Sequence, residues 1–147
     1  MASHVHDFKT TIKESLLRLV FEMMGTCLLT TLWLSTTISG DGIGFFVGFF
    51  VLLVFSARIS GSHFNPAVTL AFMLRKETGG FSRILGLAYI LFQIAGGLLG
   101  GLLGYTWFLA QPSVGVYVNP INGNVLILQA MTIETMATAI LIFLYLT

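Results

Sequence analysis

One stretch of the chain holds polar residues in a pattern that could act on a passing molecule. Residues 60–71 read Ser-Gly-Ser-His-Phe-Asn-Pro-Ala-Val-Thr-Leu-Ala. Pro66 suits the first position of a helix, because its missing N–H would have no helical partner there, and Asn65 is then a natural N-cap. Gly61 and Ser62 let the backbone approach its neighbours closely. The pattern predicts an extended strand that ends in a short helix beginning at Pro66.

The start of this predicted helix carries the chemistry. A helix N-terminus presents free N–H donors and a partial positive charge. In a watery pathway it would orient the oxygen of a passing molecule toward Asn65 and repel cations. The sequence holds no nucleophile–base pair, no ligand cluster in the apolar runs and no phosphate-binding loop. We therefore expect no enzyme activity, no metal site and no cofactor.

Two acidic residues, Glu22 and Glu134, lie inside long apolar runs. An ionisable group at membrane depth is expensive and usually has a function. Residues 22–26 and 134–138 also share the pattern Glu-x-Met-small-Thr. Internal repeats of this kind are typical of transporter and channel folds.

The composition indicates which solvent surrounds these residues. Hydrophobic residues make up 56% of the 147 residues and charged residues 9%, whereas a typical soluble domain carries about 25% charged residues. Such a chain could not cover its own surface in water, so we expect a lipid bilayer around it. The net charge of +1 excludes nucleic-acid binding, which needs a basic face. The single cysteine, Cys27, excludes an internal disulfide.

Apolar runs long enough to cross a bilayer must position the motif. A transmembrane helix needs about 20 mostly apolar residues. Residues 1–15 form a polar N-terminal tail. The four predicted spans are about Leu16–Ser39, Ile43–Ile59, Ile84–Leu109 and Val125–Leu146. A neutral loop, Ala110–Asn124, precedes the last span, and its Asn119-Pro120-Ile121 is interpreted as an ordinary turn because no short apolar helix follows it.

The apolar stretch Val68–Leu74 is too short to cross and is followed by the polar break 75–80. It is either an interfacial helix that lies on the membrane surface or a re-entrant segment that enters and returns. Non-helical backbone at membrane depth is tolerated only where protein buries it or where it lines a watery cavity. The Asn65-Pro66 motif before it favours the re-entrant interpretation.

Lysine and arginine predict the orientation. With four crossings, all seven fall on one side, and the two remaining loops hold none: Lys9, Lys13, Arg18, Arg58, Arg75, Lys76 and Arg83. Basic residues are enriched in cytoplasmic loops. We therefore expect the N-terminus on the cytoplasm-equivalent side.

The motif resembles the first asparagine–proline–alanine loop of the major intrinsic protein family, the aquaporins and aquaglyceroporins. The likeness rests on Ser60-Gly61, on His63 and on Asn65-Pro66-Ala67-Val68-Thr69. A bare Asn-Pro-Ala tripeptide is common by chance. This longer string is specific because it stands after a second predicted span and before a third.

The rest of the chain supports the resemblance. Residues 22–26, Glu-Met-Met-Gly-Thr, are similar to the family's glutamate signature in its first span, and residues 134–138 repeat that pattern. Gln93 with Gly96-Gly97 is similar to the family's packing of the third span on the loop. The resemblance covers about residues 16–147.

The resemblance implies an all-α integral membrane fold, namely an aquaporin-like half with four transmembrane helices plus one re-entrant half-helix. It makes 16–147 an incomplete membrane domain, formed by a first repeat and the first helix of a second. Residues implied to line a pore for water or small neutral solutes such as glycerol are Asn65, Val68, Phe45, and Gly61, Ser62 and His63 through their carbonyls. Residues implied to brace the re-entrant backbone are Glu22, Glu134, Gln93 and Pro66.

The family builds its pore from two inverted halves. Glu22 and Glu134 are 112 residues apart, so a second loop is expected about 112 residues after Asn65, beyond Thr147. Alone, these residues are expected not to form a sealed, selective pore.

Three interpretations stay open. The chain is a fragment of a longer channel, a half-channel that associates with a separate partner, or a channel-derived, non-conducting structural subunit of a larger membrane assembly. A small dimeric exporter of four spans would also carry an acidic residue in its first span, but the motif around Asn65 argues against it. The expected partners are the lipid bilayer, water or a small neutral solute, and other membrane polypeptides.

Overall fold

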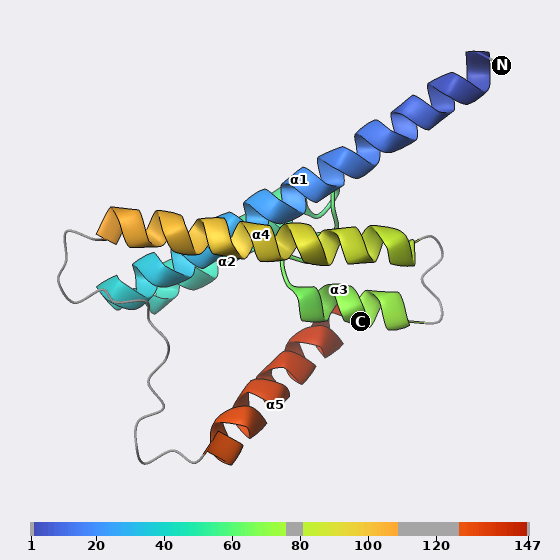
Figure 1. Ribbon diagram of the computed structural model, residues 1–147. Coiled ribbons are helices and arrows are strands. Elements are labelled where there is room, and N and C mark those ends of the chain that lie inside the picture. Colours follow the sequence, from blue (N-terminus) through green and yellow to red (C-terminus); the bar gives the residue numbers. More distant parts are fainter. Residues whose placement is uncertain (1, 76–80, 109–126, 147) are drawn as a thin grey trace.

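The computed structural model describes residues 2–75, 81–108 and 127–146, which form helices and no strand. The helices are α1 (Ala2–Ser39), α2 (Gly42–Ser56), α3 (Pro66–Leu74), α4 (Arg83–Phe108) and α5 (Ile127–Leu146) (Figure 1). The predicted all-α fold is thereby confirmed for the described residues.

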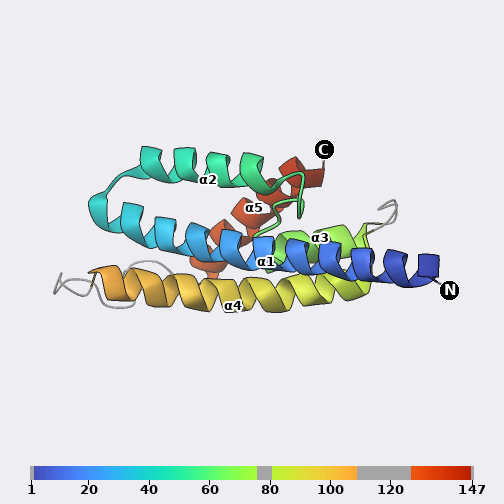
Figure 2. The same ribbon diagram turned by 90° about the horizontal axis from the view of Figure 1, so that it is seen from above.

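The helices α1 and α4 lie side by side and run in the same direction (Figures 1 and 2). A Cβ atom on Gly96 would meet the backbone carbonyl of Met23, and a Cβ atom on Gly100 would meet that of Cys27. The Thr31 hydroxyl also donates to the Gly100 carbonyl at 3.1 Å. Because no side chain stands between them, the two backbones approach closely, as small residues allow between membrane helices.

The helix α2 begins after a tight turn at the end of α1. Gly40 takes a φ of +69°, which glycine adopts without a steric penalty. Asp41 then caps α2 by accepting a hydrogen bond from the Gly44 N–H at 2.8 Å. From this turn α2 runs back along α1 (Figure 2).

The helix α3 has the predicted start and end, Pro66 and Leu74. It packs against α4 and α5 and runs from the middle of α4 toward the start of α4 (Figure 1). Its Thr69 is bonded to Gln93, ten residues into α4. At a rise of about 1.5 Å per residue, Gln93 lies about 15 Å along α4, half of the roughly 30 Å bilayer core. This packing among other helices favours the re-entrant interpretation over a helix flat on the surface.

Several element bounds differ from the prediction. The predicted polar tail, residues 1–15, is helical from Ala2 onward, because no glycine or proline interrupts the chain before Gly25. The helix α2 ends at Ser56 and not at Ile59. The predicted start of the last span, at about Val125, lies outside the described residues. The predicted loop 110–124, with its Asn-Pro turn, lies outside the described residues.

Two helices are long and apolar enough to cross a bilayer in the described part of the chain. They are Lys13–Ser39 within α1 and Arg83–Trp107 within α4. The apolar stretches Gly42–Ser56 and Glu134–Leu144 are shorter. The predicted count of four crossings stays a prediction.

Candidate functional site

The connection from α2 to α3 turns through left-handed backbone. Gly61, Ser62 and Phe64 have φ values of +89°, +53° and +45°. The predicted extended strand is therefore wrong for this segment, although Asn65, with a φ of −149°, is extended. Left-handed backbone costs a non-glycine residue about 1–2 kcal/mol. Such a conformation persists only where the surrounding structure holds it.

Glu22 of α1 holds this connection from one side, and its side chain is fully buried (0% exposed). Its Oε1 accepts hydrogen bonds from the Ser60 hydroxyl at 2.6 Å and from the His63 N–H at 3.0 Å. Its Oε2 accepts from the Phe64 N–H at 2.7 Å and from the Gln93 amide at 2.8 Å. A carboxylate has about four acceptor sites, so these four donors satisfy the buried carboxylate.

Thr69 links the half-helix to α4 and to the loop. Its hydroxyl accepts a hydrogen bond from Gln93 Nε2 at 2.9 Å, and it lies 3.1 Å from His63 Nδ1. The same Gln93 amide group donates to Glu22. The side chain of Gln93 therefore joins α3 to α1. Sequence reasoning missed Thr69, although it stands one helical turn after Asn65, a spacing that places it near the loop.

Tyr89 of α4 is a second residue that the sequence did not indicate. Its side chain is 1% exposed, and its hydroxyl donates to the Ser60 carbonyl at 2.9 Å. Tyr89 stands four residues before Gln93 and so lies on the same helix face. That spacing is the signal that could have found it.

The two side chains before Asn65 pack into the protein. The His63 ring stacks on Phe72, with ring centroids 4.5 Å apart and planes at 20°. The Phe64 ring lies over Gly25 of α1, where a Cβ atom would collide with it. Both residues are buried, so their rings fix the loop against α1 and α3.

Asn65 is half-buried at the start of α3. Its Oδ1 caps the helix by accepting a hydrogen bond from the Ala67 N–H at 2.8 Å. Within the described part of the chain, no acceptor for its amide nitrogen is found. That nitrogen is therefore placed to donate a hydrogen bond to another molecule.

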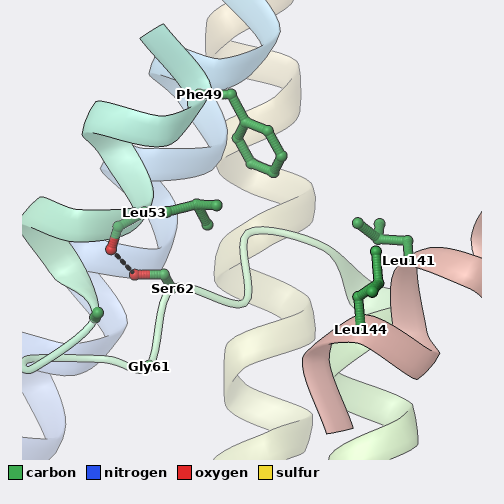
Figure 3. A pocket seen from close by; sticks show the side chains of 7 residues that line it. Phe49, Leu53, Gly61, Ser62, Leu141 and Leu144 are labelled. Atoms are coloured by element: carbon green, nitrogen blue, oxygen red, sulfur yellow. Dashed lines mark hydrogen bonds between the residues drawn. The ribbon is translucent and has the colours of Figure 1, made fainter. Parts of the chain in front are cut away.

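An open groove of about 470 Å³ lies beside the loop (Figure 3). Its lining comes from the α2 face, from the loop and from α5: Phe49, Leu53, Ala57, Gly61, Ser62, Leu141 and Leu144. Phe45 stacks on Phe49, with ring centroids 6.0 Å apart, and extends the same α2 face by one turn. The groove therefore combines apolar side chains with polar loop backbone.

Comparisons with known proteins place this architecture in a family. The Major intrinsic protein family model matches residues 2–147. The chain belongs to the major intrinsic protein family. A stretch of 62 residues is 39% identical to "Aquaglyceroporin AqpS" of Rhizobium meliloti (strain 1021) and covers 42% of this chain and 25% of that relative. No solved structure is found to match the chain.

Membership in the major intrinsic protein family makes the chain an integral membrane protein. Members of this family are channels and not enzymes, in agreement with the interpretation of the sequence.

The pore residues implied for a major intrinsic protein fall into two groups. Gly61 and Ser62 line the groove, and Asn65 is half-buried at the start of α3. The side chains of His63 and Val68 are buried, at 5% and 1% exposed. A pore-lining role for these residues, as for Phe45, stays a prediction.

Of the four residues implied to brace the loop, three lie at the loop or at the start of α3, and one does not. Glu22 and Gln93 meet at the loop, and Pro66 is the first residue of α3. Glu134 is exposed on α5, and its side chain makes no hydrogen bond to the described residues. The bracing roles stay predictions.

Proposed function

We propose that the chain supplies one half of a membrane channel in which water or small neutral solutes such as glycerol permeate passively past Asn65. One arrangement supports this proposal. The N-terminus of α3 lies halfway along the bundle, with the Asn65 amide nitrogen available to donate and with Gly61 and Ser62 at the groove. Family membership supports a channel of this solute class.

The chemistry of the groove fits a small polar solute without charge. A solute that leaves bulk water loses hydrogen bonds, which is costly unless they are replaced. In this proposal Asn65 supplies a donor, and the carbonyl of Gly61, which is exposed at the groove, supplies an acceptor. Phe49 and Leu53 on the α2 wall offer neither, so polar contacts follow the loop only. The partial positive charge at the start of α3 disfavours cations.

The proposal needs a second wall from further membrane polypeptide, as either a second half or a host assembly. A hollow of about 430 Å³ on α5 has Glu134, Thr135 and Thr138 in its lining. A carboxyl group on a membrane helix is costly unless protein or water meets it. We therefore place further protein, or the water of the channel, against this face.

An Asn65→Asp substitution separates the two roles of this side chain, namely capping α3 and donating a hydrogen bond to a solute. Aspartate keeps an oxygen for the Ala67 N–H and is a good N-cap, but it cannot donate and it adds a negative charge. We expect unchanged folding and insertion and a loss of osmotic flux by about five- to tenfold, the factor for one lost hydrogen bond. The measurement is stopped-flow light scattering of vesicles that hold the assembled protein.

Two further variants complete the test. Asn65→Ala removes the cap as well and should also destabilise the protein, by about 1 kcal/mol. Asn119→Asp makes the same chemical change at the other Asn-Pro pair and should leave the flux unchanged. A parental flux in Asn65→Asp vesicles would contradict the proposed role of Asn65 as a hydrogen-bond donor to the solute. Parent vesicles no more permeable than protein-free vesicles would instead favour the non-conducting structural subunit.

A further inference from the structure

Two serine hydroxyls connect the loop before Asn65 to the end of α2. Ser56 is the last residue of α2, and Ser62 is in the left-handed conformation. Their Oγ atoms lie 2.6 Å apart, and the Ser62 hydroxyl donates to the Leu53 carbonyl at 2.8 Å. Both serine side chains are 2% exposed. Figure 3 shows the bond from Ser62 to Leu53 at the side of the groove.

Two arrangements of the protons fit these distances, because a hydroxyl has one proton to donate. In one, Ser62 donates to the Leu53 carbonyl and Ser56 donates to Ser62. In the other, Ser62 donates to Ser56, and Ser56 donates to the Leu52 carbonyl, 3.3 Å from its Oγ. Both arrangements join Ser62 to the backbone of α2, and hydrogen bonds in such a chain strengthen each other.

The other contacts of the loop hold its neighbours and the Ser62 backbone. Glu22 bonds to Ser60, His63 and Phe64, and Tyr89 bonds to the Ser60 carbonyl. The Ser62 N–H donates to the Ser60 hydroxyl at 3.2 Å. The hydrogen bonds from Ser62 to α2 are made by its side chain, which alanine would lack.

We propose that Ser56 and Ser62 form a tether that sets the width of the groove and so determines the size of solute that passes. This inference rests on the channel function proposed above. Across the groove from the tether stand Leu141 and Leu144 of α5 (Figure 3). Without the tether, the backbone of residue 62 leaves the left-handed region, and the loop moves away from α2 toward α5. The groove then narrows, which hinders glycerol more than water.

The test is the ratio of glycerol to water permeability in vesicles of the assembled protein, because this ratio does not depend on how much protein folds or inserts. We expect Ser62→Ala to lower the ratio by about two- to tenfold, as for the loss of one or two hydrogen bonds. Ser56→Ala should lower it less, since the bond from Ser62 to Leu53 remains.

Glycine at position 62 distinguishes positioning from a general loss of packing. Ser62→Gly also removes the tether, but glycine takes a positive φ without strain, so its ratio should lie closer to that of the parent than the Ser62→Ala ratio does. Adding Ser56→Ala to Ser62→Gly should change nothing further. Ser39→Ala, which removes a hydroxyl bonded to Thr36 at the far end of α1, is the matched control with a parental ratio.

An unchanged or raised ratio in Ser62→Ala overturns the tether, as does a Ser62→Gly ratio no closer to the parent. Failure of the channel function gives a different result, namely parent vesicles that pass neither solute. The tether is then judged by the solid-state ¹³C shift of the Ser62 Cα, a reporter of backbone conformation. Ser56→Ala, which leaves the bond from Ser62 to Leu53 in place, should move that shift part of the way from its left-handed value, and an unmoved shift overturns the proposal.

Discussion

At the scale of single residues, the loop depends on one buried carboxylate that is surrounded by donors. Glu22 has no exposed surface and accepts from two backbone N–H groups, from Ser60 and from Gln93. Removing a charge from water is expensive unless close partners replace the lost hydration. Here the partners are the backbone that must be held and the α4 side chain that bonds to α3. The cost of burying the carboxylate is therefore offset by contacts that fix the loop.

Replacing Glu22 with glutamine tests this arrangement. Glutamine has the same size, but its NH₂ group would face two of the donors that now bond to the carboxylate. We expect the free energy of unfolding to fall by about 3 kcal/mol, as when a buried charged group loses its partners, which a lower Tm in detergent measures. Glu14→Gln changes an exposed residue of the same helix and should stay within about 0.5 kcal/mol. Equal losses in both variants would contradict a special role for Glu22.

The residue scale also shows which parts of the site follow from sequence. Asn65 and Pro66 predict the start of α3, because capping depends on neighbouring residues only. The left-handed backbone of Ser62 and Phe64 was not predicted, since either residue alone disfavours it and only distant contacts hold it. Tyr89 was missed for the same reason: its partner, the Ser60 carbonyl, is distant in the sequence.

At the scale of elements, the contact between α1 and α4 depends on which face of the glycine-rich helix α4 carries each glycine. Gly96 and Gly100 face the backbone of α1, whereas a Cβ atom on Gly101 would have no described atom within 4 Å. The adjacent pairs Gly96-Gly97 and Gly100-Gly101 predict close packing, but not which member of each pair makes the contact. The rotation of α4 about its own axis is fixed by Gln93 and Tyr89, because both side chains must face the loop.

Alanine substitutions at these glycines should therefore have opposite effects. Gly96→Ala puts a methyl group against the Met23 carbonyl, so α1 and α4 must separate, and we expect a loss of about 1–3 kcal/mol. Gly101→Ala adds a methyl group in open space and should be neutral or stabilising by up to about 1 kcal/mol, since alanine favours helix. Thermal unfolding in detergent compares the two. Similar destabilisation by both would mean that helix flexibility, and not the contact, requires glycine.

The element bounds were predicted where a local signal ends the helix and missed where none does. The bounds of α3 agree because Asn65-Pro66 begins it and the polar residues after Leu74 end it. The helix α1 extends to Ala2 because polarity alone does not stop a helix. The helix α2 stops early because its last carbonyl, on Ser56, receives the N–H groups of both Ile59 and Ser60 as the chain turns into the loop.

At the scale of the whole molecule, positive charge gathers at one end of the bundle. Lys13 and Arg18 lie on the N-terminal part of α1, Arg58 follows α2, Arg75 follows α3 and Arg83 begins α4. All five are exposed, and these parts of the helices lie at the same end in Figure 2. An inverted copy would place every one of them on the opposite side of the membrane. The bias of lysine and arginine therefore predicts a single orientation.

A single orientation constrains how a pore is completed, because an inverted second copy of this chain is then not available as the other half. Ser39, at the end of α1, and Ser82, just before α4, are exposed at opposite ends of the bundle. We expect single cysteines at these positions, in a Cys27→Ala background, to react with a membrane-impermeant maleimide from one side each. Ser82→Cys should label from the cytoplasm-equivalent side and Ser39→Cys from the other, while detergent-opened vesicles label both. Labelling of either position from both sides of sealed vesicles would contradict the charge argument and restore the inverted homodimer. One-sided labelling instead requires the second wall to come from different polypeptide sequence, whose own basic residues must follow the same bias.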